Sequence, residues 1–387
     1  MENPPPTIVP RWSRLSFLLS ALILLTLLLD VGLRRLPVSR VAFRTWEASR
    51  FYPTSIGPLT PNFSFFSPRA YGDLSNLGNR PQYRVYRPER FTTDAFGYRN
   101  PPQPEGGGPI RIVLLGDSFI DGAALSDDET LSAQLTSQTG ARVYNAAGTS
   151  NWEGFAELLA RLQVRGAIVI LEISEVFITG NLELDSPPGH WAVRGLRRTL
   201  PREQYRDVRT LWRIAFGWSQ YSPLRIYLTR SFRTLQNDRW LPNPTAAQAI
   251  TGALDNGHQM LFLTNRMEHL SVAPAAHVEY FVRVRDRLRQ TGNELLVVMV
   301  PDKYRVYRRF FKRPPGLAPA ASSFQNLVPA LEKAKIPALD LTPILSEQAA
   351  RLYPTGQYNF HDDDTHWNAA GVRRTAEAVA VAWRELR

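Results

Sequence analysis

From residue 109 onward, short apolar runs alternate with amphipathic stretches, and no other feature of the sequence restricts the fold as much. The apolar runs predict strands at 111–115, 141–148, 167–174, 294–300 and 338–341. The amphipathic stretches predict helices near 127–139, 152–162, 278–288, 322–334 and from 369 onward. Ser126 or Asp127 is expected to cap the first of these helices. Strands and helices that alternate in this way predict a parallel sheet with helices on both faces.

The first predicted strand, 111–115, stops at Gly116 and is followed by Asp117 and Ser118. This order places the Ser118 hydroxyl at the carboxyl edge of the sheet, where parallel α/β folds usually carry their chemistry. Gly-Asp-Ser is also common in ordinary turns. On this stretch alone, the turn interpretation and the nucleophile interpretation are equally open.

A second constellation, NFHDDDTHWNAAG (359–371), precedes the last predicted helix. Asn368 is expected to cap that helix, which places His366 in a loop at the same sheet edge as Ser118. A carboxylate two or three residues earlier can hold the imidazole in one tautomer while the imidazole takes the serine proton. Asp363 and Asp364 both qualify by their distance along the chain.

The same acidic loop allows a different interpretation, in which His361 and His366 hold a metal ion with the three aspartates. The chain has no cysteine, which excludes disulfides, thiolate metal sites and a cysteine nucleophile. We predict the serine triad, with no metal and no cofactor.

The N-terminus predicts a membrane anchor. Residues 15–29 carry no charge, and the apolar character continues to Leu33, which just reaches the length of about 20 residues that a helix needs to cross a bilayer. No small-residue cleavage site follows, so an uncleaved anchor at 13–36, after a tail at 1–12, is expected rather than a removed signal peptide.

The charge distribution bears on orientation and on partners. Arginines follow the apolar segment at positions 34, 35, 40, 44 and 50, against two before it, and by the positive-inside rule this places the main domain in the cytoplasm. The net charge of +11 comes mostly from arginine. Because no nucleic-acid motif and no basic stripe with stacking aromatics occurs, we expect no nucleic acid partner.

Two further stretches complete the domain plan. Residues 37–108 are expected to form a connecting segment with a possible strand at 82–91, before a main domain at 109–387. An insertion at about 180–276 interrupts that domain and is expected to be partly helical, lying over the catalytic edge or against the membrane. Ordinary core packing explains its tryptophans equally well; they are Trp191, Trp212, Trp218 and Trp240.

Ser118 in Gly-Asp-Ser-Phe near the start of the fold, together with Asp363-x-x-His366 near its end, resembles the GDSL/SGNH hydrolase superfamily. The resemblance covers about 109–386 without the insertion. It implies a flavodoxin-like sheet in which Ser118 is the nucleophile, His366 the general base and Asp363 the residue that orients it.

The resemblance also implies an oxyanion hole, formed by the Ser118 amide and by an amide that follows Asn145. Gly148 or Ser150 would supply the second amide, since only a backbone N–H is needed there. The usual Gly-x-Asn-Asp block after the third strand is replaced by LEISE (171–175). The asparagine donor is therefore missing, and fast esterase chemistry is not expected.

VPDK (300–303), followed by Tyr304 and Tyr307, and DTHW (364–367) resemble the SGNH-like proteins of alginate and related exopolysaccharide O-acetylation. In that group the aspartate two residues before the histidine orients it, which here is Asp364. The DTHW block precedes the serine block in that group, whereas here it follows the serine. The resemblance implies an exported protein that acts on cell-envelope polysaccharide and depends on a membrane-bound O-acyltransferase.

We therefore expect a single-pass protein of the cytoplasmic membrane whose domain lies on the periplasmic side, against the arginine count. The expected activity is serine acyl transfer that adds or removes O-acetyl groups on a cell-surface polysaccharide. Two alternatives stay open: a GDSL-type esterase or lipase on small esters, and a non-catalytic polysaccharide-binding scaffold.

Overall fold

The computed structural model describes most of the predicted main domain and part of the chain before it. The described residues are 11–33, 56–78, 80–102, 108–149, 152–175, 222, 224, 225, 228, 232, 249–263, 277–313, 322 and 324–387. Ser150 and the four tryptophans of the predicted insertion lie outside these ranges.

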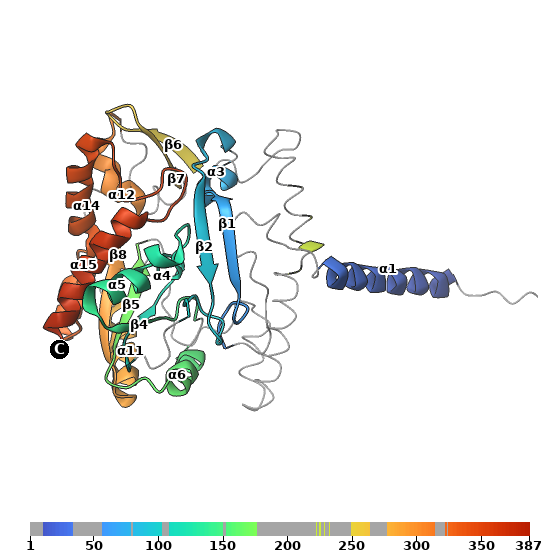
Figure 1. The fold of residues 1–387 in the computed structure, drawn as a ribbon, viewed down its shortest axis with the longest axis horizontal. Helices are drawn as coiled ribbons and strands as arrows, with labels where there is room; N and C mark the ends of the chain where they lie inside the picture. The colour runs from blue at the N-terminus through green and yellow to red at the C-terminus, as the bar shows by residue number, and fades with distance from the viewer. Residues whose placement is uncertain are drawn as a thin grey trace, which may run out of the picture.

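A five-stranded parallel sheet forms the centre of the fold, as predicted (Figure 1). Its strands are β3 (Ile110–Leu115), β4 (Arg142–Asn145), β5 (Ile168–Ser174), β8 (Glu294–Val300) and β9 (Ala338–Asp340). They lie in the order β4-β3-β5-β8-β9. The first strand in sequence therefore lies between the second and the third, which is the flavodoxin-like order, and the carboxyl ends at this reversal form the usual site crevice.

Helices cover both faces of the sheet because side chains along each strand alternate between the faces. In β3, Ile112 and Leu114 join the core on one face, whereas Val113 joins the core on the other. The first face is covered by α5 (Leu131–Thr139), α14 (Leu341–Leu352) and α15 (Ala369–Glu385). The second face is covered by α6 (Trp152–Arg161), α11 (Val278–Gln290) and α13 (Leu327–Lys333).

Two details of the helices differ from the prediction. The residue that caps α5 is Thr130, whose side chain accepts a hydrogen bond from the Ala133 amide, and not Ser126 or Asp127. Ser126 instead precedes a separate 3₁₀ turn, Asp127–Glu129, where its own amide donates to the Glu129 carboxylate at 2.9 Å. The extended backbone of Thr130 ends that turn before α5 begins. In addition, α14 was not predicted.

The stretch before the sheet contains regular structure. β1 (Ser64–Ala70) and β2 (Arg87–Thr92) pair antiparallel, with α3 (Asp73–Leu77) between them in sequence. The strand expected at 82–91 thus begins later, at Arg87. Figure 1 shows the β1–β2 pair beside the α/β domain.

The described part of the predicted insertion contains helical residues, at 224, 225, 228 and 232, and a β-hairpin that was not predicted. The hairpin consists of β6 (Ala249–Ala253) and β7 (Gln259–Leu263). Leu74 of α3 packs against Ala249 and Leu261, so the hairpin and the N-terminal stretch meet in a small apolar cluster.

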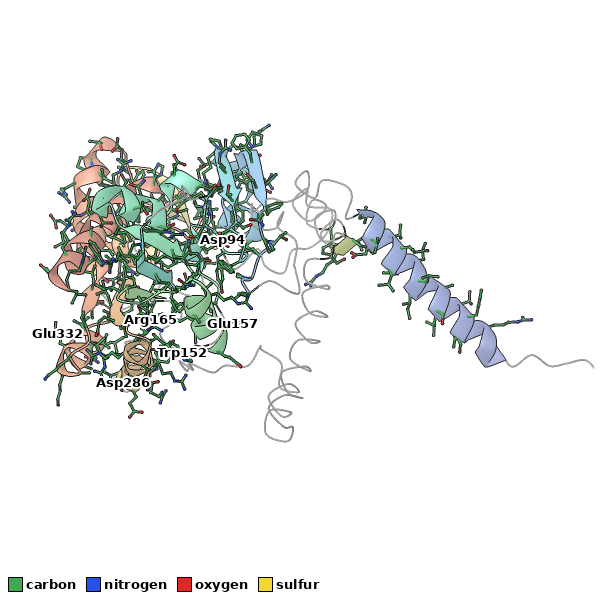
Figure 2. The ribbon with its side chains drawn as sticks, turned by 60° about the horizontal axis from the view of Figure 1, so that its bottom comes forward. Asp94, Trp152, Glu157, Arg165, Asp286 and Glu332 are labelled. Carbon is green, nitrogen blue, oxygen red and sulfur yellow. The ribbon has the colours of Figure 1, made fainter. Side chains whose placement is uncertain are left out.

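Near the N-terminus, the helix α1 (Arg11–Leu33) extends away from the α/β domain (Figure 1), and its side chains from Arg14 to Leu29 are exposed (Figure 2). Its residues Arg14–Leu33 are long and apolar enough to cross a membrane, although a signal sequence near an N-terminus would have the same character. Asp30, at its C-terminal end, is buried and accepts hydrogen bonds from the Ser222 hydroxyl and the Leu224 amide.

Candidate active site

Ser118 is the first residue of the short helix α4 (Ser118–Asp121), directly after the tight turn that follows β3. Asp117 caps α4, because its side chain accepts a hydrogen bond from the Phe119 amide at 2.8 Å. Phe119 is buried whereas Ser118 is exposed, so the turn presents the hydroxyl at the carboxyl edge of the sheet. Glycine is needed at 116 because a Cβ there would lie 2.4 Å from a Glu172 carboxylate oxygen.

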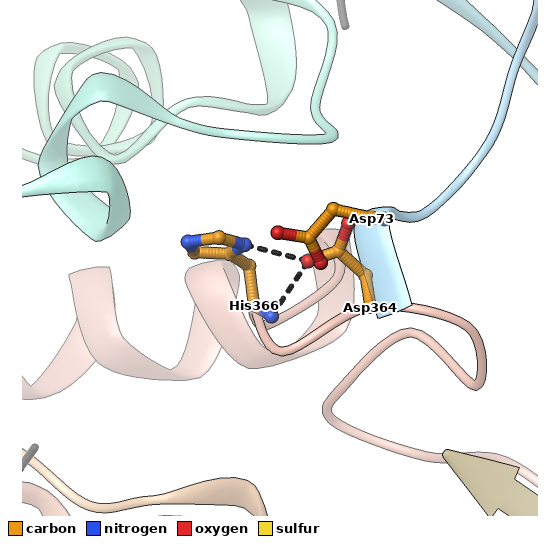
Figure 3. Close-up of side chains that lie close together, drawn as sticks. All are labelled: Asp73, Asp364 and His366. Carbon is orange, nitrogen blue, oxygen red and sulfur yellow. Dashed lines mark hydrogen bonds and ion pairs between the residues drawn. The ribbon is translucent and has the colours of Figure 1, made fainter. Parts of the chain in front are cut away.

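Ser118, His366 and Asp364 form a continuous relay of hydrogen bonds. The His366 Nε2 lies 2.7 Å from the Ser118 Oγ, and its Nδ1 lies 2.6 Å from the Asp364 Oδ1. The same Asp364 oxygen accepts the His366 backbone amide at 3.0 Å, as the dashed lines of Figure 3 show. The Phe119 ring packs on the imidazole at 4.9 Å between centroids, which limits rotation of the imidazole.

The second oxygen of Asp364 is held from the N-terminal stretch. It accepts the Asp73 backbone amide at 2.9 Å, and the Arg87 guanidinium lies 3.9 Å away. Both partners come from residues that the sequence predicted only as a connecting segment. Nothing in their local sequence pointed to a site, because neither follows a strand of the parallel sheet.

Asp363 bonds elsewhere. Its carboxylate accepts the Gly72 amide at 2.7 Å, the Val85 amide at 2.9 Å and the Arg87 guanidinium at 2.9 Å. Its backbone carbonyl accepts the amide of Leu74 at 3.1 Å. The backbones approach so closely that a Cβ at Gly72 would lie 2.2 Å from that carbonyl oxygen. Of the two aspartates left open by the sequence, Asp364 therefore contacts the imidazole, and Asp363 ties the N-terminal stretch to the loop.

The relay shifts the pKa values of both ionisable partners. Burial, the largest single effect, lowers the pKa of His366, but the charge and hydrogen bond of Asp364 outweigh it and the net pKa is raised above 6.5. Burial likewise favours a higher pKa for Asp364, yet the His366 charge and hydrogen bond, with the Arg87 charge, hold that pKa well below 3.8. The Asp364 carboxylate is therefore ionised wherever the imidazole titrates.

This arrangement predicts an acid limit for the reactivity of Ser118. Only neutral His366 can accept the serine proton, and its raised pKa means that it is protonated, and inactive, to a higher pH than an ordinary histidine. We expect the rate of Ser118 labelling by a fluorophosphonate to fall as the pH drops through an apparent pKa above 6.5. Labelling measured across the pH range tests this. An acid limb at or below 6.5 would contradict the relay.

The block that replaces the expected asparagine donor consists of two buried carboxyls. The Glu172 Oε2 accepts the Asp117 amide at 3.0 Å, and its Oε1 has no hydrogen-bond partner among the described residues. Burial, and then the charge of Asp117, raise the pKa of Glu172 well above 4.5. Glu175 forms a buried ion pair with Arg305 and accepts the Asp302 amide at 2.9 Å. Both side chains support the turns at the strand ends.

The block after β4 also differs from the expected oxyanion site. The Gly148 amide donates to the Gly116 carbonyl at 3.1 Å, so it cannot reach an oxyanion unless that bond breaks. Asn145 is structural, since its side-chain amide donates to the Ile120 carbonyl at 2.8 Å and so ties β4 to α4. Ser150, the other candidate, lies outside the described residues. Ser118 is the first residue of α4, where backbone amides have no partner within the helix.

Among the described residues, Asp73, Asp364 and His366 form a group of potential metal ligands within 4.8 Å of one another (Figure 3). This differs from the set considered from the sequence, because Asp73 replaces His361 and the other two aspartates. Both imidazole nitrogens already have partners in Ser118 and Asp364, so a metal would have to displace the relay.

Comparison with known proteins identifies the last third of the chain. Residues 259–387 match the model of a family described as an SGNH hydrolase-like domain, acetyltransferase AlgX. This confirms the resemblance to the SGNH-like O-acetylation proteins over the region that holds Asp364 and His366; Ser118 lies before it. The match supports an enzyme that acts on esters.

The solved structures that match the chain have low sequence identity and low TM-scores. The crystal structure of protein YXIM from Bacillus subtilis is 12% identical over 77% of this chain and 71% of its own, with a TM-score of 0.36. Two further crystal structures are 10% identical over 72% of this chain and 97% and 99% of theirs, with TM-scores of 0.35 and 0.30. Similarities at these TM-scores support no conclusion. No curated protein sequence matches the chain.

Proposed function

We propose that this chain is a serine acyltransferase that adds or removes O-acetyl groups on a cell-surface polysaccharide. The observation that carries the proposal is the relay from the Ser118 Oγ through His366 to Asp364, with distances of 2.7 Å and 2.6 Å. Three residues so arranged at the carboxyl edge of a parallel sheet are the parts of a nucleophilic triad. The acetyltransferase family match over 259–387 supports the acetyl group as the one transferred.

In the first step, the Asp364 carboxylate keeps the proton of the neutral imidazole on Nδ1, which leaves Nε2 to accept the Ser118 proton. The Ser118 oxygen then attacks the carbonyl carbon of the acetyl donor and forms a tetrahedral oxyanion. When this intermediate collapses, the bond to the donor breaks and the leaving group takes the proton from the imidazolium. The product is an acetyl-serine with the imidazole neutral again.

In the second step, His366 takes a proton from a sugar hydroxyl, whose oxygen attacks the acetyl-serine. Collapse of the second oxyanion releases the acetylated sugar, and the imidazolium returns its proton to Ser118. Water in place of the sugar would release acetate. We assign one oxyanion donor to the Ser118 amide. Because Glu172 and Glu175 replace the asparagine of ordinary SGNH enzymes, the oxyanion receives fewer donors and each step should be slow.

We further propose that α1 anchors the protein in the cytoplasmic membrane with the α/β domain outside it. The length and apolar character of Arg14–Leu33 support an anchor or an export signal. A polysaccharide substrate and a membrane-bound O-acyltransferase that supplies acetyl groups would both be met at that surface. The predicted tryptophan-rich insertion is proposed to contribute to acceptor binding.

The test separates transfer from hydrolysis. We expect the full chain to release acetate slowly from a small chromogenic acetate ester in water alone. Acetylated product should appear when an oligosaccharide acceptor is added. A bound hydroxyl that is held in line with the acetyl carbon has a high effective concentration, so it competes with attack by water that is not held in line. Mass spectrometry of the oligosaccharide and measurement of free acetate follow the two products.

Each outcome discriminates between the hypotheses. Rapid hydrolysis that ignores the acceptor would favour a plain esterase on small esters. Absence of turnover with or without acceptor, together with no labelling of Ser118 by a fluorophosphonate, would favour a non-catalytic scaffold.

A further inference from the structure

Lys303 is a buried lysine next to the candidate triad that the mechanism above does not use. It is the first residue of α12 (Lys303–Tyr307), directly after β8 and the capping residue Asp302. Only 3% of its surface is exposed. Its place at a strand end was visible in the sequence, but its burial was not.

The Lys303 ammonium is surrounded by backbone carbonyls. Its Nζ donates to the carbonyl oxygens of Leu261 at 2.9 Å, His361 at 2.5 Å, Asp362 at 3.2 Å and Asp364 at 3.1 Å. An ammonium has three N–H groups, so all of them are used and one is shared. Three of the four carbonyls belong to the loop that runs through Asp364 to His366.

That loop is therefore wrapped around one cation. A bridge between Phe360 and Trp367 closes its base, and the His361 amide donates to the His366 carbonyl at 3.2 Å. Inside the loop, the backbone carbonyls of His361, Asp362 and Asp364 point toward the Lys303 ammonium. If the ammonium were removed, buried carbonyls would lose their donor, and the loop would have to rearrange to find others.

The charge of Lys303 is balanced locally. Asp302, Asp362, Asp363 and Asp364 all stabilise the ammonium, and the face of the Phe262 ring lies 5.0 Å from Nζ. The buried imidazole of His361 also faces this group, and burial first, then the Arg87 and Lys303 charges, hold its pKa well below 6.5. Burial outweighs the four carboxylates and lowers the pKa of Lys303 to about 8.

We propose that Lys303 is a positioning residue: its ammonium holds the loop 361–366 in the conformation in which His366 reaches Ser118. This inference rests on the proposed function only in using Ser118 reactivity as its readout. Lys303 itself lies behind the loop and does not touch the reacting atoms.

The first test replaces the cation with an apolar side chain of similar length. In the full chain, Lys303→Met should lower the rate of Ser118 labelling by a fluorophosphonate about 10²-fold, the order of loss for a displacement of about 1 Å at a reacting group. Lys333→Met, at an exposed position at the end of α13, is the matched control and should label at the wild-type rate. Far-UV circular dichroism confirms that the variants are folded.

The second test measures whether an added ammonium ion can replace the Lys303 side chain. Added methylammonium should restore labelling of Lys303→Ala, because it supplies both charge and N–H donors to the vacated space. Tetramethylammonium, which has the charge without donors, should not. Equal labelling of folded Lys303→Met and wild type, or equal rescue by the two cations, would overturn the proposal.

The third test uses the unmodified chain and holds even if these variants do not fold. Above its pKa of about 8, Lys303 loses its charge and one donor, so wild-type labelling should decline on the alkaline side near that pH. A rate that stays level well above pH 8 would overturn the proposal. If the wild type does not label at any pH, the proposed serine chemistry fails, which is a different result from normal labelling that is indifferent to Lys303.

Discussion

Replacing Ser118 with alanine is expected to lower the rate of acetyl transfer by about 10⁶-fold, the size of loss seen when the nucleophile of a serine triad is removed. The effect is large because the acetyl group loses its covalent acceptor and His366 has no hydroxyl left to activate. Ser118 is exposed and contributes no core packing, so the free energy of unfolding should change only through the loss of its hydrogen bond to His366. Acetate release, product mass spectrometry and fluorophosphonate labelling measure the loss.

Ser137→Ala is the matched control for this variant. Ser137 lies exposed on α5, and its substitution should leave both labelling and transfer at the wild-type level. Retention of transfer by Ser118→Ala at more than a small fraction of the wild-type rate would show that another group carries the acetyl.

The second large effect is expected from Asp364→Asn, which should lower turnover by about 10⁴-fold. The asparagine side chain can donate to Nδ1, which moves the imidazole proton to Nε2, the nitrogen that must accept from Ser118. Loss of the carboxylate charge should also shift the acid limb of the pH profile downward, because that charge raises the pKa of His366. Turnover and labelling measured across the pH range report both changes.

Asp363→Asn provides the neighbouring comparison, with a different expected signature. Asp363 pairs with Arg87 and accepts amides from Gly72 and Val85, and its side chain is fully buried. Breaking such a pair should lower the free energy of unfolding by about 3–5 kcal/mol, because Arg87 would lose most of its compensation. The folded fraction should keep far more turnover than Asp364→Asn. Equal and mild effects of the two substitutions on turnover would mean that neither aspartate orients His366.

Much of the fold was predictable because it depends on local patterns. Buried runs such as 167–174 read as strands of a parallel sheet without any knowledge of their neighbours. Alternation of strands and helices then determines the direction of successive strands, and so puts their carboxyl ends at one edge. This is why Ser118 and His366, 248 residues apart, could be expected at the same edge from the sequence alone.

Local patterns were less informative in two places: where the sequence periodicity does not distinguish helix from strand, and where two neighbouring residues could each cap a helix. The hairpin β6–β7 was not predicted, and its strands are stabilised by pairing with each other and by Leu261 packing on Leu74. The cap of α5 moved to Thr130 because the chain makes a separate turn first. Both outcomes depend on contacts outside the window that a pattern covers.

The sequence by itself determined the succession of strands and helices along the chain, the turn that exposes Ser118 and the presence of His366 beside two candidate aspartates. It could not choose between Asp363 and Asp364, since both lie within reach of the histidine along the chain. That choice is made by the N-terminal stretch, whose Gly72 amide engages Asp363 from 291 residues away. Likewise, only the tertiary structure places the Lys303 ammonium among the carbonyls of the loop. A buried charge or carboxylate adopts the position where its hydrogen bonds are satisfied, and the partners that satisfy them come together only when the chain is folded.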